Sequence, residues 1–199
     1  MSALRRLVLI RHGETDGESS VRFHGAGDVA LSPTGAAQMR RVTAALGPER
    51  FDRVVASPLR RSWQSAWIAG RGLPVSLESD FREVHFGRWE GLTREEIQGS
   101  DPVLYADWQS GAAGFEYPGG EARAAFRDRV GRGLERLLGC DARSALVVVH
   151  KGVIRAIAER LTGEAPPRDE PPLGGAIELT RDGHGSWFRG RHTSNPAPA

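Results

Sequence analysis

The sequence predicts an α/β fold of three layers, in which a mostly parallel sheet lies between helices on both of its faces. Strand-like and helix-like segments alternate along the chain, as they do where helices connect parallel strands. Continuous apolar runs at residues 7–10 and 146–149 are typical of central strands buried on both sides. The length of 199 residues fits one domain, which we expect to span residues 1–192.

The first part of the chain supplies two strand–helix pairs. The strand at residues 7–10 is followed by Ser32, which can cap a helix, and by a proline suited to the first helical position. A helix is therefore predicted over residues 33–46, before a Gly-Pro pair. Residues 54–56 form the second predicted strand, and residues 59–69 the second helix.

The second part of the chain repeats the pattern and then closes with a hairpin. Residues 121–138 carry apolar side chains at helical spacing. The strand at residues 146–149 leads into another helix, whose apolar face extends to Leu161. Residues 176–179 and 187–189 are predicted to pair as antiparallel strands around an Asp-Gly turn.

The regular alternation breaks between residues 93 and 120. This stretch carries four aromatic residues and ends in a Pro-Gly-Gly turn, so we expect a lid-like insertion at about 93–120 that lies over a site. The aromatic side chains either pack the insertion onto the domain or stack on a flat base in the substrate. The Pro- and Ala-rich residues 193–199 are expected to form a disordered tail.

Charge and cysteine content disfavour several classes of function. The formal net charge is +2, and all basic residues except Lys151 are arginines spread along the chain, so nucleic-acid binding is not expected. The single cysteine, Cys140, cannot form an internal disulfide, which is compatible with a reducing compartment. No apolar stretch approaches membrane-spanning length. We expect a soluble cytoplasmic protein with no membrane partner, and a homodimer as the default oligomeric state.

Two predicted strands end in a histidine. Arg11 and His12 follow the first strand, and His150 follows the strand at residues 146–149. The strand at residues 54–56 leads to Arg61. In open α/β sheets, ligands bind beyond the carboxyl ends of the strands, so these side chains are expected to meet at one edge of the sheet.

This set of side chains suits a phosphate group. Arg11 and Arg61 can each offer a planar fork of donors to phosphate oxygens. Their charge should keep His12 neutral and nucleophilic and should stabilise the transferring group. A phosphohistidine on His12 would divide hydrolysis into two easier displacements.

We expect neither a metal nor another cofactor. The six histidines include no H-E-x-x-H pattern and no closely spaced ligand set. A metal-dependent hydrolase is nevertheless kept as an alternative, and insensitivity to EDTA would remove it.

Several short motifs follow one another along the chain. In order, they are R-H-G-E-T at residues 11–15, a Gly/Asp/Leu/Gly/Gln pattern at residues 25–38, S-P-L-x-R at residues 57–61, a stretch around Phe81-Arg82-Glu83 and Trp89-Glu90-Gly91, P-G-G-E at residues 118–121, and His150. These motifs resemble those of the histidine phosphatase superfamily, which includes the phosphoglycerate mutases and the α-ribazole phosphatases, except that Ala30 replaces the usual proline of the second motif. The resemblance extends from residue 7 to about residue 161 and implies a phosphoglycerate mutase-like fold.

The resemblance implies a metal-independent phosphomonoester hydrolase with five catalytic residues. His12 would be the nucleophile, and Glu83 would protonate the leaving oxygen and then activate water. His150 would bind the phosphoryl oxygens together with the two arginines, Arg11 and Arg61. The residues expected to contact the substrate are Thr15, Arg22, His24, Gly25 and Lys151.

Three positions depart from the family pattern. Glu18 stands where relatives usually carry an asparagine that helps to hold the phosphate, so its carboxylate should point away or pair with an arginine such as Arg22. His24 replaces a common glutamine, and Lys151 replaces a glycine, which adds a cation near the rim of the site. These changes affect substrate recognition rather than the core reaction.

The branch of the family is predicted from the insertion. It contains one basic residue, Arg94, so nothing in it is expected to hold the second acidic group of a mutase substrate, and hydrolysis is favoured over mutase-type phosphoryl transfer. The short chain, the W-E-G stretch and the P-G-G-E motif look most like an α-ribazole phosphatase. The expected partner is α-ribazole 5′-phosphate or another small phosphorylated metabolite. A non-catalytic binding protein on this fold is a further alternative, although all five catalytic positions are present.

Overall fold

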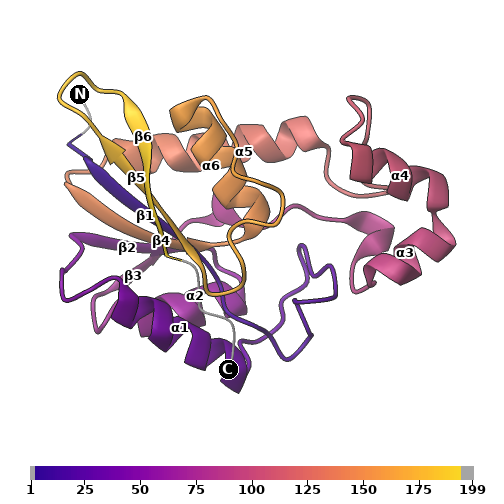
Figure 1. Ribbon diagram of the computed structural model, residues 1–199, viewed down its shortest axis with the longest axis horizontal. Helices are drawn as coiled ribbons and strands as arrows, with labels where there is room; N and C mark the ends of the chain where they lie inside the picture. The colour runs from indigo at the N-terminus through magenta and orange to yellow at the C-terminus, as the bar shows by residue number, and fades with distance from the viewer. Residues whose placement is uncertain (1–2, 194–199) are drawn as a thin grey trace.

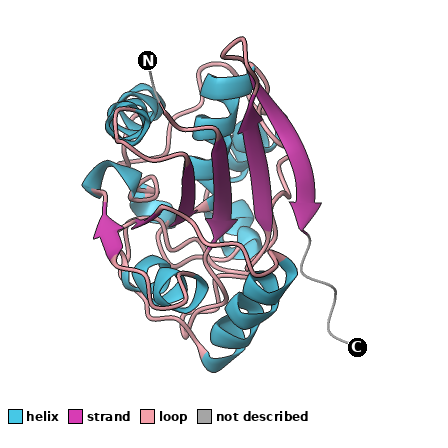
Figure 2. Ribbon diagram, turned by 90° about the vertical axis from the view of Figure 1, so that its left-hand side faces the viewer, coloured by secondary structure: helices cyan, strands magenta, loops and turns pink. Residues whose placement is uncertain are grey.

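The computed structural model describes residues 3–193, which form a six-stranded sheet covered by helices on both faces (Figures 1 and 2). The order of the strands across the sheet is β3-β2-β4-β1-β5-β6. Their bounds are β1 (Arg6–Arg11), β2 (Arg53–Ala56), β3 (Val75–Leu77), β4 (Ser144–Val149), β5 (Ala176–Arg181) and β6 (Trp187–Thr193).

The pairing confirms a mostly parallel sheet. Strands β3, β2, β4 and β1 run parallel to one another, whereas β5 is antiparallel to β1 and β6 is antiparallel to β5. In the β1–β4 pair, Arg11 lies opposite Val149. The residues that follow these two positions are His12 and His150, so the register alone brings the two histidines together at the carboxyl edge of the sheet.

The helices form the two outer layers of the predicted three-layer fold. Helices α1 (Pro33–Ala45) and α2 (Arg60–Ala69) cover one face, and α5 (Arg123–Leu138) and α6 (Lys151–Thr162) cover the other. Ser32 caps α1 as predicted, because its hydroxyl accepts a hydrogen bond of 3.0 Å from the backbone N–H of Gly35.

Each central strand contributes to both cores because its side chains alternate between the two faces. Leu7 and Leu9 of β1 pack with α5 and α6, whereas Val8 and Ile10 pack with α1 and α2. All four of these side chains are fully buried. Burial on both faces explains why the strand reads as a continuous apolar run rather than as an alternating one.

The predicted insertion folds as a helical lobe beside the sheet (Figure 1). It contains α3 (Arg94–Ser100) and α4 (Pro102–Ser110), and Thr93 and Glu96 form a capping box at the start of α3. Its aromatic residues form a core with Trp89, which is fully buried, and Phe23. Of the two roles considered for these aromatics, the structure supports packing.

Two details of the chain differ from the sequence-based expectation. Strand β3 was not predicted, because it is three residues long and its Leu77 is exposed. Thr193 is the last residue of β6 rather than the first residue of a tail, and residues 194–199 of that predicted tail lie outside the described range. Within residues 3–193, no helix is long and apolar enough to cross a membrane.

Candidate active site

His12 lies directly after β1 and is only 4% exposed. Its backbone N–H donates to the carbonyl of Val149, which continues the β1–β4 pairing by one residue. Its Nδ1 lies 2.8 Å from the carbonyl oxygen of Gly13. Since a carbonyl can only accept a hydrogen bond, Nδ1 must carry the proton, and Nε2 keeps its lone pair.

Arg61 approaches this free nitrogen from the start of α2. Its Nε donates to His12 Nε2 over 3.2 Å, and its two terminal nitrogens donate to the carbonyl oxygens of Gly27 (2.6 Å) and Gly25 (2.7 Å). The side chain is almost fully buried. Arg61 therefore stands beside the predicted nucleophile, as the S-P-L-x-R match implied, and the 25–27 loop fixes its orientation.

His150 and Arg11 complete the polar floor of the pocket. The ring centroids of His12 and His150 are 5.2 Å apart, with the rings inclined at 62°. Neither ring nitrogen of His150, nor Nε of Arg11, has a hydrogen-bond partner among the described residues, although all three atoms are buried. Buried polar groups normally have partners, so these atoms are the natural contacts for the oxygens of a bound anion.

Glu83 reaches the same pocket from the loop after the 3-10 helix η1 (Ser79–Phe81). Its Oε1 accepts from the backbone N–H of Val84 and its Oε2 from that of Gly152, both over 3.0 Å. Glu83 is 9% exposed. Burial raises the pKa of this carboxyl above its usual value, against the opposing effects of the two backbone N–H groups, Arg61 and Arg11. A carboxyl with a raised pKa is suited to donating a proton.

The surrounding charges keep both histidines neutral. Burial, followed by the positive charges of Arg61 and Arg11, holds the pKa of His12 well below 6.5. The pKa of His150 is lowered in the same direction, by burial first and then by Arg61, His12 and Arg11. A neutral imidazole with an unprotonated Nε2 is the nucleophilic form.

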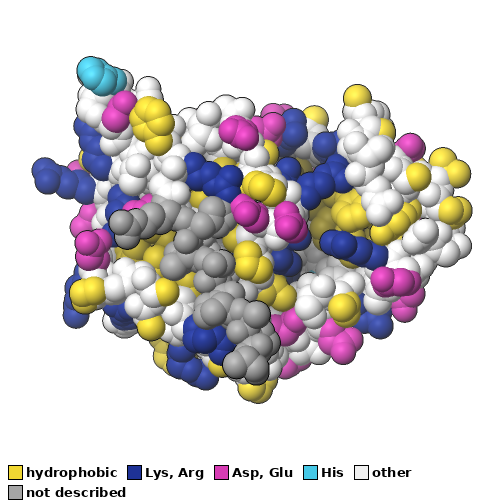
Figure 3. Space-filling model, viewed as in Figure 1, with side chains coloured by type: hydrophobic (Ala, Val, Ile, Leu, Met, Phe, Trp, Pro, Cys, Tyr) yellow, Lys and Arg dark blue, Asp and Glu magenta, His cyan; other side chains and the backbone are white. Residues whose placement is uncertain are grey.

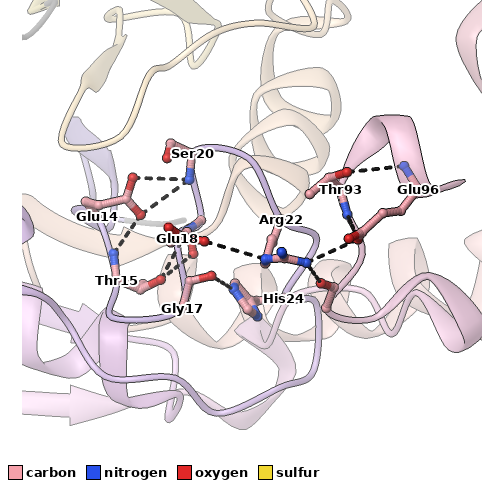
Figure 4. Close-up of polar contacts among 11 residues, drawn as sticks. Glu14, Thr15, Gly17, Glu18, Ser20, Arg22, His24, Thr93 and Glu96 are labelled. Atoms are coloured by element: carbon pink, nitrogen blue, oxygen red, sulfur yellow. Dashed lines mark hydrogen bonds and ion pairs between the residues drawn. The ribbon is translucent and has the colours of Figure 1, made fainter.

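Four of the five predicted substrate contacts lie in the loop after His12, and Figure 4 shows the interactions of Thr15, Arg22 and His24. The Thr15 hydroxyl lies 2.9 Å from that of Ser19. His24 Nε2 bonds to the carbonyl of Gly17. Gly25 has no room for a Cβ, and its carbonyl holds Arg61. The roles of Thr15, His24 and Gly25 as substrate contacts stay predictions, and in the structure each of them helps to shape the loop.

Arg22 and Glu18 are paired, as one of the expectations for Glu18 required. Arg22 Nε lies 3.6 Å from Glu18 Oε2, and its Nη1 donates to Glu96 Oε2 (3.1 Å) and to the carbonyl of Gly91 (2.8 Å) (Figure 4). Arg22 thus connects this loop with the α3–α4 lobe. Its predicted role as a substrate contact stays a prediction, since these acceptors already engage its guanidinium.

Lys151 is the first residue of α6, next to His150. It forms no ion pair with a carboxylate in residues 3–193. Burial, together with the positive charges of Arg11, Arg94 and Arg155, lowers its pKa to about 8. Of the five predicted substrate contacts, Lys151 is the one whose cation is left available beside the pocket.

Sequence reasoning missed two supporting residues. Gly152 matters because a Cβ there would overlap the carboxylate of Glu83. Tyr117 lies near Glu83, and burial is the main reason that its pKa is raised to about 12. The glycine was visible in the sequence as part of His150-Lys151-Gly152, but the element that it faces was not. No motif pointed to the tyrosine.

Comparison with known proteins identifies relatives over nearly the whole chain. A family model described as the histidine phosphatase superfamily (branch 1) matches residues 7–181. A glucosyl-3-phosphoglycerate phosphatase of Mycolicibacterium vanbaalenii is 32% identical over 197 residues, covering 94% of this chain and 84% of that protein. An adenosylcobalamin/α-ribazole phosphatase of Salmonella typhimurium is 31% identical over 159 residues, covering 78% of this chain and 79% of that protein.

A solved structure agrees with these sequence matches. The α-ribazole phosphatase of Shigella flexneri superposes with a TM-score of 0.80 at 26% identity, covering 98% of both chains. The shared fold includes the sheet that positions His12, Arg61 and His150.

Proposed function

The chain belongs to the histidine phosphatase superfamily, and from that premise we propose that it hydrolyses a small phosphomonoester through a phosphohistidine on His12. The observation that carries the proposal is the state of the His12 ring. Its Nδ1 donates to the Gly13 carbonyl, so its Nε2 is unprotonated, and this atom lies beside His150 and accepts a hydrogen bond from Arg61 that a phosphoryl group can replace. That is the arrangement that a nitrogen nucleophile at phosphorus requires.

In the first step, His12 Nε2 attacks phosphorus and the bond from phosphorus to the ester oxygen breaks. The departing oxygen takes the proton of the Glu83 carboxyl, whose pKa is raised mainly by burial. Arg11, Arg61 and His150 stabilise the phosphoryl oxygens, where charge accumulates in the transition state. The step leaves an alcohol, a phosphohistidine and a Glu83 carboxylate.

In the second step, the Glu83 carboxylate accepts a proton from water, whose oxygen attacks phosphorus. The phosphorus–nitrogen bond breaks, which releases inorganic phosphate and restores neutral His12 and protonated Glu83. The two backbone N–H groups that hold the Glu83 oxygens keep the carboxylate in place during both proton transfers. The residues of this cycle account for every proton without a cofactor.

The proposal specifies the reaction, but for the substrate it gives only a chemical class. Relatives are named as phosphatases of glucosyl-3-phosphoglycerate and of α-ribazole phosphate, so both classes are candidates. Stacking of a flat base on the insertion has less support than it had from the sequence, because Trp89, Tyr105 and Phe115 are buried in the lobe's own core. A small phosphorylated metabolite remains the proposed partner.

Mutase-type transfer is the second candidate, and it differs from hydrolysis in the acceptor of the phosphoryl group. A mutase passes the group from the histidine to a substrate hydroxyl, whereas the proposed enzyme passes it to water. Release of inorganic phosphate in proportion to alcohol supports hydrolysis. Isomerised phosphate ester without inorganic phosphate would support the mutase. A non-catalytic role is contradicted by turnover of either kind.

The decisive experiment removes the nucleophile. His12→Ala should abolish turnover of phosphomonoesters without added metal, while circular dichroism and the thermal midpoint show that the fold is retained. Rapid acid-free quenching of the parent with labelled substrate should trap a phosphoenzyme that is labile to acid and stable to base. The matched control is His184→Ala, in an exposed hairpin turn, which should keep full activity. Appreciable activity in His12→Ala would show that the mechanism is wrong.

A further inference from the structure

Four cations from three different elements form a cluster beside the active site, and two of them, Arg94 and Arg168, flank the ring of Trp108. Arg94 belongs to α3, Lys151 and Arg155 lie one turn apart on α6, and Arg168 lies in the loop after α6. In residues 3–193, none of the four is within ion-pair distance of a carboxylate.

The contacts link these cations into one cluster. The guanidinium carbons of Arg94 and Arg168 each lie 5.9 Å from the centre of the Trp108 ring. Arg168 also donates to the carbonyl of Trp108 over 3.0 Å. After burial, the charge of Arg168 lowers the pKa of Arg155, and the charges of Arg94 and Arg155 are among those that lower the pKa of Lys151. Lys and Arg side chains are seen gathered around the hollow beside the α3–α4 lobe (Figure 3).

The cluster stands on the side of the pocket where the leaving group must lie. Glu83 protonates the leaving oxygen in the proposed function, so the rest of the substrate extends past Glu83. Lys151 directly precedes Gly152, whose backbone N–H donates to Glu83 Oε2 over 3.0 Å, so the start of α6 lies beside the Glu83 carboxyl. Arg155, one turn further along α6, donates to the carbonyl of Pro166, and Arg168 follows two residues later and donates to the carbonyl of Trp108. The path from Glu83 along α6 therefore leads to the ring that the arginines flank.

Like charges held this close repel one another, and a bound anion would remove that repulsion. The phosphoryl group cannot serve this purpose, because it is held by Arg11, Arg61 and His150. We propose that Lys151 and Arg94, supported by Arg155 and Arg168 around Trp108, form a second anion subsite that binds a carboxylate or other anionic group on the leaving portion of the substrate. This inference rests on the proposed function and narrows its substrate class to phosphomonoesters that carry a second negative charge.

A matched pair of substrates tests the subsite. Glycerol 3-phosphate and 3-phosphoglycerate differ in replacing a hydroxymethyl group with a carboxylate. The parent should hydrolyse 3-phosphoglycerate with a kcat/KM roughly tenfold to hundredfold higher, which is the usual effect of a hydrogen bond to a charged group. Lys151→Gln and Arg94→Gln should each reduce this ratio by about tenfold.

The control is Arg160→Gln, on the same helix. Arg160 pairs with Glu135 over 3.0 Å and lies outside the cluster, so its replacement should leave the ratio unchanged. A ratio near one in the parent overturns the subsite, as does a ratio that Lys151→Gln and Arg94→Gln leave intact.

Binding without turnover separates this proposal from the proposed function. In His12→Ala, calorimetry should show 3-phosphoglycerate binding about tenfold more tightly than glycerol 3-phosphate, and adding Arg94→Gln should remove the difference. If that difference is found although the parent hydrolyses neither ester, the hydrolase proposal fails and the subsite stands. Equal affinities, or no binding of either ester, overturn the subsite whatever the parent hydrolyses.

Discussion

The reactivity of the site depends on the protonation of two side chains, His12 and Glu83. The proton on Nδ1 of His12 is fixed by the neighbouring carbonyl of Gly13, so the residue after the nucleophile selects its tautomer. Burial raises the pKa of the Glu83 carboxyl, which favours its protonated form, even though four polar groups oppose the shift. Burial favours the neutral form of both groups, so the same surroundings lower the pKa of His12 and raise that of Glu83.

The proton on Glu83 can be tested by changing the leaving group. Glu83→Gln should slow formation of the phosphoenzyme from an alkyl phosphate by about 10²–10⁴-fold, the usual range for general acid catalysis. Nitrophenyl phosphate should be affected far less, because nitrophenolate leaves without a proton. The comparison is made in a single turnover, since the second step uses the same carboxylate.

Equal losses for the two substrates would show that Glu83 acts through its charge or position rather than by donating a proton. Two other carboxylates near the pocket have defined tasks. Glu14 accepts from the backbone of Thr15 and Ser20, and Glu90 from that of Ala26 and Phe86. Replacing either one should disturb its loop and affect both leaving groups alike.

At the scale of elements, the start of α6 combines three tasks in consecutive residues. His150 faces the pocket, Lys151 belongs to the cation cluster, and Gly152 leaves space for Glu83 while its N–H holds that carboxylate. The requirement for glycine here is steric, because the residue is helical and its backbone conformation is open to any amino acid.

The steric requirement at Gly152 gives a prediction. Gly152→Ala should displace the Glu83 carboxylate and lower kcat/KM for an alkyl phosphate by roughly 10²-fold, since small displacements in a catalytic site have effects of that size. Steady-state kinetics would measure this loss. The matched control is Gly99→Ala in α3, where an added Cβ meets nothing within 4 Å. A normal rate in Gly152→Ala would show that Glu83 can shift without consequence.

The sequence predicted correctly those elements whose apolar residues follow a strong pattern. Residues 7–10 and 146–149 read as buried strands because both faces of the sheet are covered, and their histidines were placed correctly at one edge. The three-residue β3 carries no such pattern, since its Leu77 is exposed. Arg61 was found from its motif, but the carbonyls of Gly25 and Gly27 that hold it become visible only in three dimensions.

The surroundings of Arg94 could not be predicted from the insertion alone. Arg94 is the one basic residue of the insertion, and the prediction drawn from this, that hydrolysis is favoured over mutase-type transfer, stays a prediction. In the folded chain Arg94 lies over the ring of Trp108, as does Arg168 from the loop after α6. Such neighbours come from a distant part of the sequence and become visible only in three dimensions.

For the whole molecule, the buried neutral histidines connect stability with pH. His12 and His150 have folded pKa values well below 6.5, whereas in the unfolded chain both would be near that value. Below about pH 6.5 the unfolded state therefore binds more protons, and the free energy of unfolding falls by about 1.4 kcal/mol per pH unit for each histidine. Glu83 opposes this fall between about 4.3, its unfolded pKa, and its raised folded pKa.

Urea unfolding at pH 7, 6 and 5 measures this dependence. His150→Gln removes one of the two groups, so the loss of stability between pH 6 and 5 should be smaller by about 1.4 kcal/mol. His184→Gln, at an exposed turn, should leave the dependence unchanged. The slope is the relevant readout, because the buried amide can lower stability equally at every pH. An unchanged slope in His150→Gln would contradict the assignment.

The strand order β3-β2-β4-β1-β5-β6 also determines at what stage of translation the active site of this protein can be completed. The first strand to emerge, β1, lies in the sheet between β4 and β5, and both of these strands are translated after residue 143. At roughly 5–20 residues per second, β1 waits on the order of ten seconds for β4. During that time both edges of its apolar run lack the strands that pair with them in the folded sheet. His12 and His150 become neighbours only when β4 has paired with β1. A nascent chain therefore has no phosphatase activity before the last stage of its synthesis.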